Sequence, residues 1–181
     1  KWKNLLVDKG SRNDVVKNSQ AVIGLPDPGN KGSWSEKNAD RLTTARALLQ
    51  ACDSVDQMIY QAKVNATRNR YTLEVYQQVS ELIKYSAQML LTLEEFDQPS
   101  ELTDQSEKLK ALGSLQTRFD EVRTKFESIY GQTRVLTKPD NYILDQDHHR
   151  HSANQTQSFD WQFTAELAIL DQISELIEQN Q

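Results

Sequence analysis

Apolar residues that recur at steps of three and four constrain the fold of this chain most strongly. The first such stripe comprises Leu42, Ala45, Leu49, Cys52, Val55, Ile59, Ala62 and Ala66. A helix repeats every 3.6 residues, so this spacing places the stripe on one face. It predicts a helix of roughly 30 residues that begins near Ser33, where Ser33 and Glu36 fit a capping box.

Three further stretches repeat this pattern, at about residues 69–96, from 100 or 103 to 130, and 158–178. The first of them has a wide stripe, which indicates packing against more than one neighbour. Its members are Leu73, Tyr76, Val79, Ile83, Leu90 and Leu93, widened by Val75, Leu82 and Met89. The very short link before it leaves two arrangements open, an antiparallel hairpin or one longer, bent helix.

Strand signals are nearly absent, so we predict an all-α fold. The expected architecture is an up-and-down bundle of three to four long helices, with an extended N-terminal arm and one long crossover loop. We expect residues 1–34 to form the arm and a loop, because residues 25–30 are a proline- and glycine-rich turn cluster. Residues 35–181 form the bundle domain, with the crossover loop at 132–157.

The composition of the chain disfavours some classes of partner. A hydrophobic fraction of 37% with 26% charged residues suits a soluble protein, and the net charge of −5 disfavours nucleic acid and anionic membranes. No apolar run approaches the ~20 residues of a membrane span.

The single cysteine, Cys52, excludes an internal disulfide and is expected in the core. Because the chain starts at Lys1-Trp2, we expect a processed form or a piece of a longer protein.

The crossover loop holds the residues best suited to bind a metal. His148, His149 and His151 follow Asp145 and Asp147 within the stretch from 133 to 161. Imidazole and carboxylate groups suit zinc, nickel or copper, although the spacing matches no known helical or knuckle pattern. The competing interpretation is a polar loop that covers one end or side of the bundle, with Tyr142, Ile143 and Leu144 as apolar anchors.

Calorimetry with zinc or nickel distinguishes the two interpretations. A metal site predicts a heat of binding that the triple alanine variant at His148, His149 and His151 loses, because the imidazole ligands are gone. A covering loop predicts the same heats for both proteins. Identical heats would therefore exclude the metal site.

Other candidate residues have common structural roles. Trp2, Trp34 and Trp161 could stack on sugar rings or contact a partner, but tryptophans at helix edges more often anchor loops. The acidic pairs Asp120-Glu121 and Glu94-Glu95 lie within predicted helices and are interpreted as solvated. No catalytic or cofactor-binding residue is assigned, and no cofactor is expected unless the histidine loop binds a metal.

Residues 34–97 read as a helical hairpin with the sequence Ala66-Thr67-Arg68-Asn69-Arg70-Tyr71-Thr72-Leu73-Glu74-Val75-Tyr76 near its turn. This stretch resembles the helical regions that follow the catalytic barrel in bacterial family 20 glycoside hydrolases, the β-N-acetylhexosaminidases. The catalytic signature of that family is an Asp-Glu pair at the end of a barrel strand. Asp120-Glu121 lies mid-helix instead, so no catalytic residue is carried over.

The resemblance implies a non-catalytic accessory domain of a larger carbohydrate-active enzyme, periplasmic or secreted. Such a domain would pack on the catalytic domain of the same parent chain, or shape access to it, and possible carbohydrate contact would involve the tryptophans. It predicts an exposed apolar patch where the partner docks. The alternative is an independent ligand- or metal-binding interaction module that uses the 133–161 loop. A free-standing enzyme would need convergent titratable groups in a pocket, and the histidine loop is the only plausible cluster.

Overall fold

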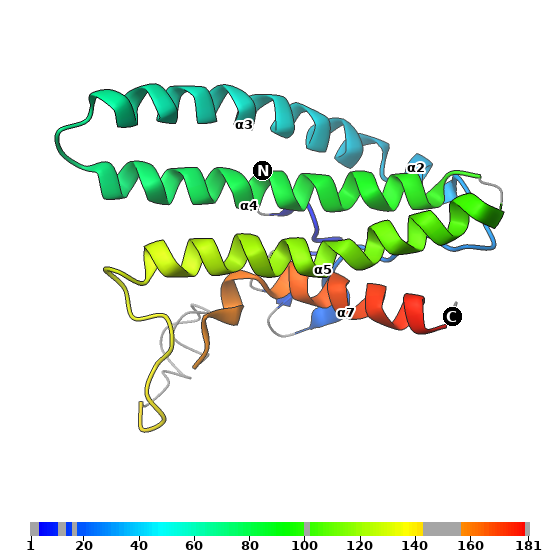
Figure 1. Cartoon of the computed structure of the whole chain (residues 1–181). Coiled ribbons are helices and arrows are strands. Elements are labelled where there is room, and N and C mark those ends of the chain that lie inside the picture. The colour runs from blue at the N-terminus through cyan, green and yellow to red at the C-terminus, as the bar shows by residue number, and fades with distance from the viewer. Residues whose placement is uncertain (1–3, 11–13, 16–17, 100–101, 143–156, 180–181) are drawn as a thin grey trace.

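The computed structural model describes residues 4–10, 14–15, 18–99, 102–142 and 157–179 (Figure 1). The helices within these ranges are α2 (Ser33–Lys37), α3 (Ala39–Asn65), α4 (Arg70–Asp97), α5 (Leu102–Tyr130) and α7 (Thr164–Glu178), with two 3-10 turns, η2 (Ser19–Ala21) and η3 (Phe159–Gln162). The predicted all-α bundle is confirmed. The only β pairing among the described residues is an isolated antiparallel bridge between Val7 and Val22.

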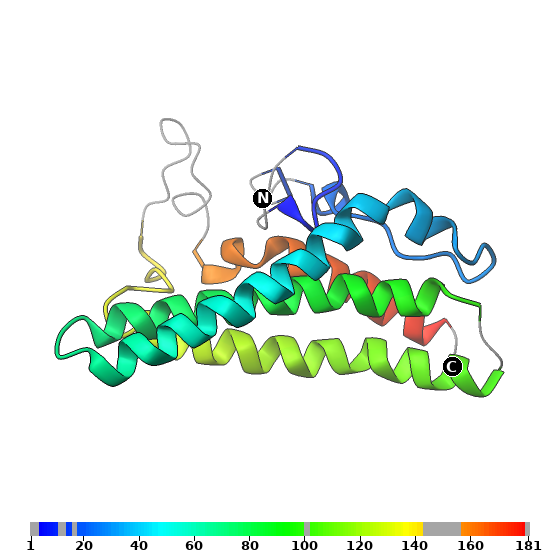
Figure 2. The ribbon, with the colours of Figure 1, turned by 90° about the horizontal axis from the view of Figure 1, so that it is seen from above.

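Helices α3, α4 and α5 lie side by side with α4 in the middle, and α7 packs beside α5 (Figure 1). Seen from above, α3 crosses α4 diagonally (Figure 2). The question left open by the sequence is settled: α3 and α4 form an antiparallel hairpin. Asn69 closes its turn at φ 60°, a left-handed conformation that asparagine tolerates better than most residues.

The start of the first helix differs from the prediction. The helix is divided at Asn38 into α2 and α3, and the predicted capping box does not form. Ser33 Oγ instead donates a hydrogen bond to the carbonyl of Asn30. The acceptor for the first turn comes from a distant residue: the Ser35 N–H donates a hydrogen bond to Asp97 Oδ2 at 2.8 Å. The fully buried Asp97 carboxylate thus replaces the local cap.

The fourth helix also begins later than predicted. A 3-10 turn, η3, precedes it, and Ser158 caps that turn by accepting a hydrogen bond from the Asp160 N–H at 3.1 Å. The α-helix proper starts at Thr164, after Phe163. The predicted first turn of the helix is therefore a separate element that carries Phe159 into the core.

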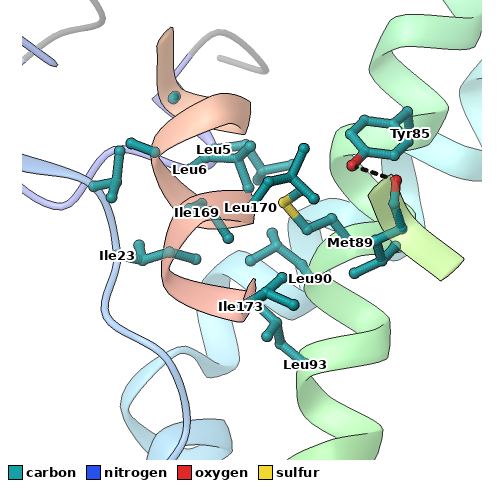
Figure 3. Close-up of a cluster of buried hydrophobic side chains, with 14 of the residues drawn as sticks. Leu5, Leu6, Ile23, Tyr85, Met89, Leu90, Leu93, Ile169, Leu170 and Ile173 are labelled. Carbon is teal, nitrogen blue, oxygen red and sulfur yellow. Dashed lines mark hydrogen bonds between the residues drawn. The ribbon is translucent and has the colours of Figure 1, made fainter. Parts of the chain in front are cut away.

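The main core lies where α4, α7 and the N-terminal arm meet (Figure 3). Its residues are almost entirely inaccessible to solvent: Met89, Leu90 and Leu93 from α4, Ile169, Leu170 and Ile173 from α7, and Leu5, Leu6 and Ile23 from the arm. The arm is therefore part of the packed structure. Although its residues are far from α7 in sequence, they complete the same apolar cluster.

Arg41 of α3 holds the backbone of the arm in place. Its guanidinium donates to the carbonyl oxygens of Leu5 at 2.9 Å and Val7 at 2.8 Å, and lies 3.6 Å from the carboxylate of Asp8. A buried segment without regular secondary structure needs such external partners for its carbonyl groups. The chain supplies them from the side of a helix.

We expect Leu6→Ala to lower the free energy of unfolding by about 2–5 kcal/mol, because it leaves a cavity in the core. Leu6 is only 1% exposed, despite its position near the chain start. Urea unfolding followed by circular dichroism measures the change. Val135→Ala is the control, since Val135 is 82% exposed. A loss below about 0.5 kcal/mol for Leu6→Ala, the range of ordinary surface substitutions, would show that the arm does not belong to the core.

Candidate interaction surface

An apolar groove of about 490 Å³ runs between the far halves of α3 and α4. We call it the α3–α4 groove. Helix α3 lines it with Leu48, Ala51, Cys52, Val55, Met58, Ile59 and Ala62. Helix α4 lines it with Leu73, Tyr76, Val79, Ser80 and Ile83.

The side chains of the groove leave a large apolar area in contact with solvent. Met58 is 68% exposed, Tyr76 59% and Val55 43%. None of the lining residues is charged, and only Ser80 and Tyr76 carry a side-chain oxygen. Contiguous apolar surface of this kind is typical of sites where a protein or ligand binds. The accessory-domain hypothesis predicts an exposed apolar patch, and whether this groove is that docking site stays a prediction.

Cys52 lies at the floor of the groove and is 5% exposed, as its place in the helical stripe predicted. Burial raises the pKa of its thiol above the ordinary value, because the thiolate would lose its hydration. The thiol is therefore neutral near pH 7 and behaves as a small apolar side chain. Its role in the groove is packing rather than nucleophilic chemistry.

An ion-pair network borders the floor of the groove. Lys84 Nζ lies 2.5 Å from Asp56 Oδ2 and 3.0 Å from Asp53 Oδ1. The hydrogen bond that Lys84 donates to Asp56 is the largest effect on Lys84 and raises its pKa. Asp56 is one helical turn from Cys52 along α3, and Lys84 is one turn from Ser80 along α4, so these charges flank the apolar lining.

The predicted metal ligands His148, His149, His151, Asp145 and Asp147 lie outside the described residues. The anchors Ile143 and Leu144 do too, so the loop hypothesis stays a prediction. Within the part of the chain that the structure describes, no group of three or more His, Cys, Asp or Glu side chains is placed to hold a metal ion.

The base of the crossover loop is held together by Gln157. Its N–H groups donate to the carbonyl oxygens of Lys138 at 3.4 Å and Pro139 at 3.0 Å, and the Lys138 N–H donates to the Gln157 carbonyl at 3.0 Å. Tyr142, the one predicted apolar anchor within the described residues, is 49% exposed. Lys138 Nζ lies 5.0 Å from the centre of the Tyr142 ring, and the two side chains pack on each other at the surface.

Trp34 and Trp161, the tryptophans within the described ranges, hold neighbouring segments of the chain in place. Trp34 is 7% exposed, and its Nε1 donates to the Gly24 carbonyl at 2.6 Å, which fixes the turn cluster to α2. Trp161 meets the ring of Phe159 edge to face at 5.9 Å. Trp2 lies outside the described residues. Since Trp34 is buried, it presents no open face to a sugar.

The acidic pairs do not form a catalytic site. Asp120 and Glu121 are both exposed on α5, and Glu95 is exposed on α4. Glu94 forms an ion pair with Arg46 at 2.5 Å. The interpretation as solvated residues is confirmed for Asp120, Glu121 and Glu95, whereas Glu94 is partly buried.

Periodicity places most groove residues in core stripes and does not show that several of them, such as Val55 and Tyr76, remain exposed. Met58 is the available signal, because it is apolar but lies outside the stripe defined by Val55 and Ile59. With Ala51, it widens the apolar face of α3 beyond what one neighbouring helix covers.

No protein-family model, curated protein or solved structure matches this chain. None of the helices in the described ranges is long and apolar enough to span a bilayer.

The acid sensitivity of the loop base can be tested at Asp160. Its carboxylate accepts a hydrogen bond from Arg123 at 2.5 Å, and its backbone N–H donates to Ser158 Oγ at 3.1 Å in the capped turn. Burial acts to raise the pKa of Asp160, but the bonds from Ser158 and Arg123 outweigh it, so the pKa falls below the ordinary 3.8. The ionised group thus stabilises the fold above about pH 4, and this stabilisation is lost as the pH falls through its folded-state pKa.

We expect Asp160→Asn to destabilise the protein at pH 7 by at most about 1 kcal/mol, since the side chain is 49% exposed and solvent screens the pair. The difference from the unmodified protein should shrink between pH 4 and pH 2. Thermal unfolding across this range measures it, with the exposed carboxylate variant Asp171→Asn as control. A difference that is independent of pH would contradict the assignment.

Proposed function

We propose that this chain is a non-catalytic helical domain of a larger carbohydrate-active enzyme, and that it packs against the catalytic domain through the α3–α4 groove. The observation that carries the proposal is the groove itself. It joins exposed apolar side chains from two helices into one surface that has no charged lining residue. Covering such a surface with another protein surface lowers the free energy, because apolar side chains are removed from water.

Burial of the groove side chains contributes enough free energy for two domains of one chain to dock. Burial of a fully exposed Met, Val or Leu side chain contributes about 1.5–3 kcal/mol. Met58, Tyr76 and Val55 together offer several such contributions, and a tethered domain loses less translational freedom than a free partner. Contacts confined to this groove can therefore hold two linked domains together.

The carbohydrate-active class is supported by the resemblance of residues 34–97 to the helical regions of family 20 glycoside hydrolases. That stretch corresponds to α2, α3 and α4, so it includes both walls of the groove. The solvated position of Asp120 and Glu121 supports a non-catalytic role for this part. The sugar chemistry would then belong to the remainder of the parent protein.

We expect Met58→Glu in the full-length parent protein to loosen the contact between this domain and the rest. A buried, unpaired carboxylate opposes docking, whereas the same carboxylate is hydrated when the groove is open. Limited proteolysis should then release this domain several-fold faster, and hydrolysis of a chromogenic N-acetylglucosaminide should change with it. The fold of the domain should be unaffected, because Met58 is a 68% exposed surface position.

Tyr60→Glu is the matched control. Tyr60 is 72% exposed on the same helix, but two residues from Met58 and so about 160° away around α3. Equal proteolysis of the two variants would contradict docking through the groove. A parent protein without hydrolytic activity on any glycoside would contradict the carbohydrate-active class.

A further inference from the structure

We propose that a small pocket between the N-terminal arm and α2 binds a small organic ammonium ion through Asn38 and Asp27. We call it the arm pocket. Its volume is about 210 Å³, and it shares no lining residue with the α3–α4 groove. The site therefore goes beyond the proposed function, and neither depends on the other.

The arm pocket combines a buried apolar wall with exposed polar side chains. Ile23 and Trp34 are 2% and 7% exposed, and with the partly buried Leu25 they form the apolar wall. The exposed side chains that line the pocket are all polar: Asp8, Asp27, Ser33 and Lys37. Pockets for drug-sized ligands measure about 300–1,000 Å³, so this pocket suits a smaller molecule.

Asn38 supplies a buried acceptor that has no partner. This lining residue joins α2 to α3 and is only 6% exposed. Its Nδ2 donates to the Trp34 carbonyl at 2.9 Å, and because a carbonyl can only accept, this bond identifies which end of the amide is the oxygen.

The amide oxygen of Asn38 does not serve the helix that it could cap. Asn38 occupies the N-cap position of α3, where an asparagine oxygen usually accepts a backbone N–H of the first turn, but no such bond forms. Its Oδ1 therefore accepts no hydrogen bond from the residues that the structure describes. A buried acceptor without a partner favours a ligand that carries an N–H or O–H donor.

Other polar groups of the pocket have already used their hydrogens. Ser33 Oγ donates to the Asn30 carbonyl at 2.8 Å, so toward a ligand it can only accept. Trp34 Nε1 donates to the Gly24 carbonyl at 2.6 Å. The lining side chains thus offer mainly acceptors, and Lys37 is the one cation among them. A ligand that fits must bring its own donors.

Asp27 supplies the negative charge. Its Oδ1 accepts the Gly29 N–H at 2.8 Å, and none of the ion pairs within the described ranges includes it. The nearby cation Lys31 donates to the Phe96 carbonyl at 2.8 Å instead. The Asp27 carboxylate is therefore available to a bound cation.

A protonated primary amine matches this combination. It carries three N–H donors and one positive charge, so it can bond to Asn38 Oδ1 and pair with Asp27 at the same time. Its carbon atoms then contact the apolar wall. A metal ion fits less well, because in the described part of the chain no three His, Cys, Asp or Glu side chains are placed around one ion. Asp8, the second carboxylate, lies 3.6 Å from Arg41 and is partly neutralised.

Titration of the 181-residue chain with three compounds of similar shape tests the proposal. Benzylamine is cationic near neutral pH, benzyl alcohol is neutral and benzoate is anionic. Proton–nitrogen correlation spectra report binding through the assigned indole N–H of Trp34, which lies in the pocket wall. We expect benzylamine to shift this signal saturably and to bind about fivefold more tightly than benzyl alcohol, because a bond to a charged donor is stronger than one to a neutral donor.

Substitutions at exposed positions assign the affinity to this pocket. Asp27→Asn should weaken benzylamine binding about threefold, since it removes a partly solvated charge. Asp40→Asn is the matched control, because Asp40 is exposed two residues from Asn38 but does not line the pocket. Lys37→Gln should tighten binding about threefold, since it removes the competing cation. A pocket that was merely damaged could not bind more tightly.

Four results would each overturn the proposal. The absence of a saturable Trp34 shift with benzylamine would show that the pocket binds no ammonium ion. Equal affinities for benzylamine and benzyl alcohol would show that only the apolar wall matters. Tighter binding of benzoate would show that Lys37 decides the chemistry. Equal losses in Asp27→Asn and Asp40→Asn would show nonspecific attraction to an acidic surface. None of these results bears on docking through the α3–α4 groove, which the Met58→Glu variant tests.

Discussion

The structure depends on the contact between the C-terminal half of α4 and two segments from opposite ends of the chain. Met89, Leu90 and Leu93 are buried against α7 and the N-terminal arm (Figure 3). Neither the arm nor α7 can cover its apolar face alone, and α4 brings the two together. The same contact determines which part of α4 is left open, because the cover ends near Ser86 and the groove begins at Ile83.

Polar interactions complete this arrangement where the chain leaves regular structure. Asp97, at the end of α4, accepts the Ser35 N–H and thereby positions α2. Arg41 satisfies the carbonyls of the arm, and Gln157 closes the base of the crossover loop. Each of these side chains hydrogen-bonds to backbone groups that are distant in sequence. Such polar contacts favour one defined packing of the segments. Among the described residues, no such segment covers the far half of the hairpin, so its apolar face stays open to solvent.

Helical periodicity was sufficient to predict the all-α bundle, the four long helices and the burial of Cys52, since these follow from which side chains share a face. It failed at the helix starts. Ser33 and Glu36 have the residue types of a capping box, but Asp97 competes successfully for the first turn of α2. Periodicity has nothing to say about Tyr142 in the loop, an aromatic ring that the structure leaves half exposed beside Lys138. The histidine loop lies outside the described residues, so its chemistry stays a prediction.

By itself, the sequence determined that Val55, Ile59, Tyr76 and Val79 lie on apolar helix faces, because a 3.6-residue repeat fixes which side chains are neighbours along a helix. Only the tertiary structure decided which of those faces are covered. Leu90 and Val79 belong to one stripe of α4, yet the arm and α7 reach the first and not the second. Coverage depends on where distant segments end, and a local repeat contains no information about that.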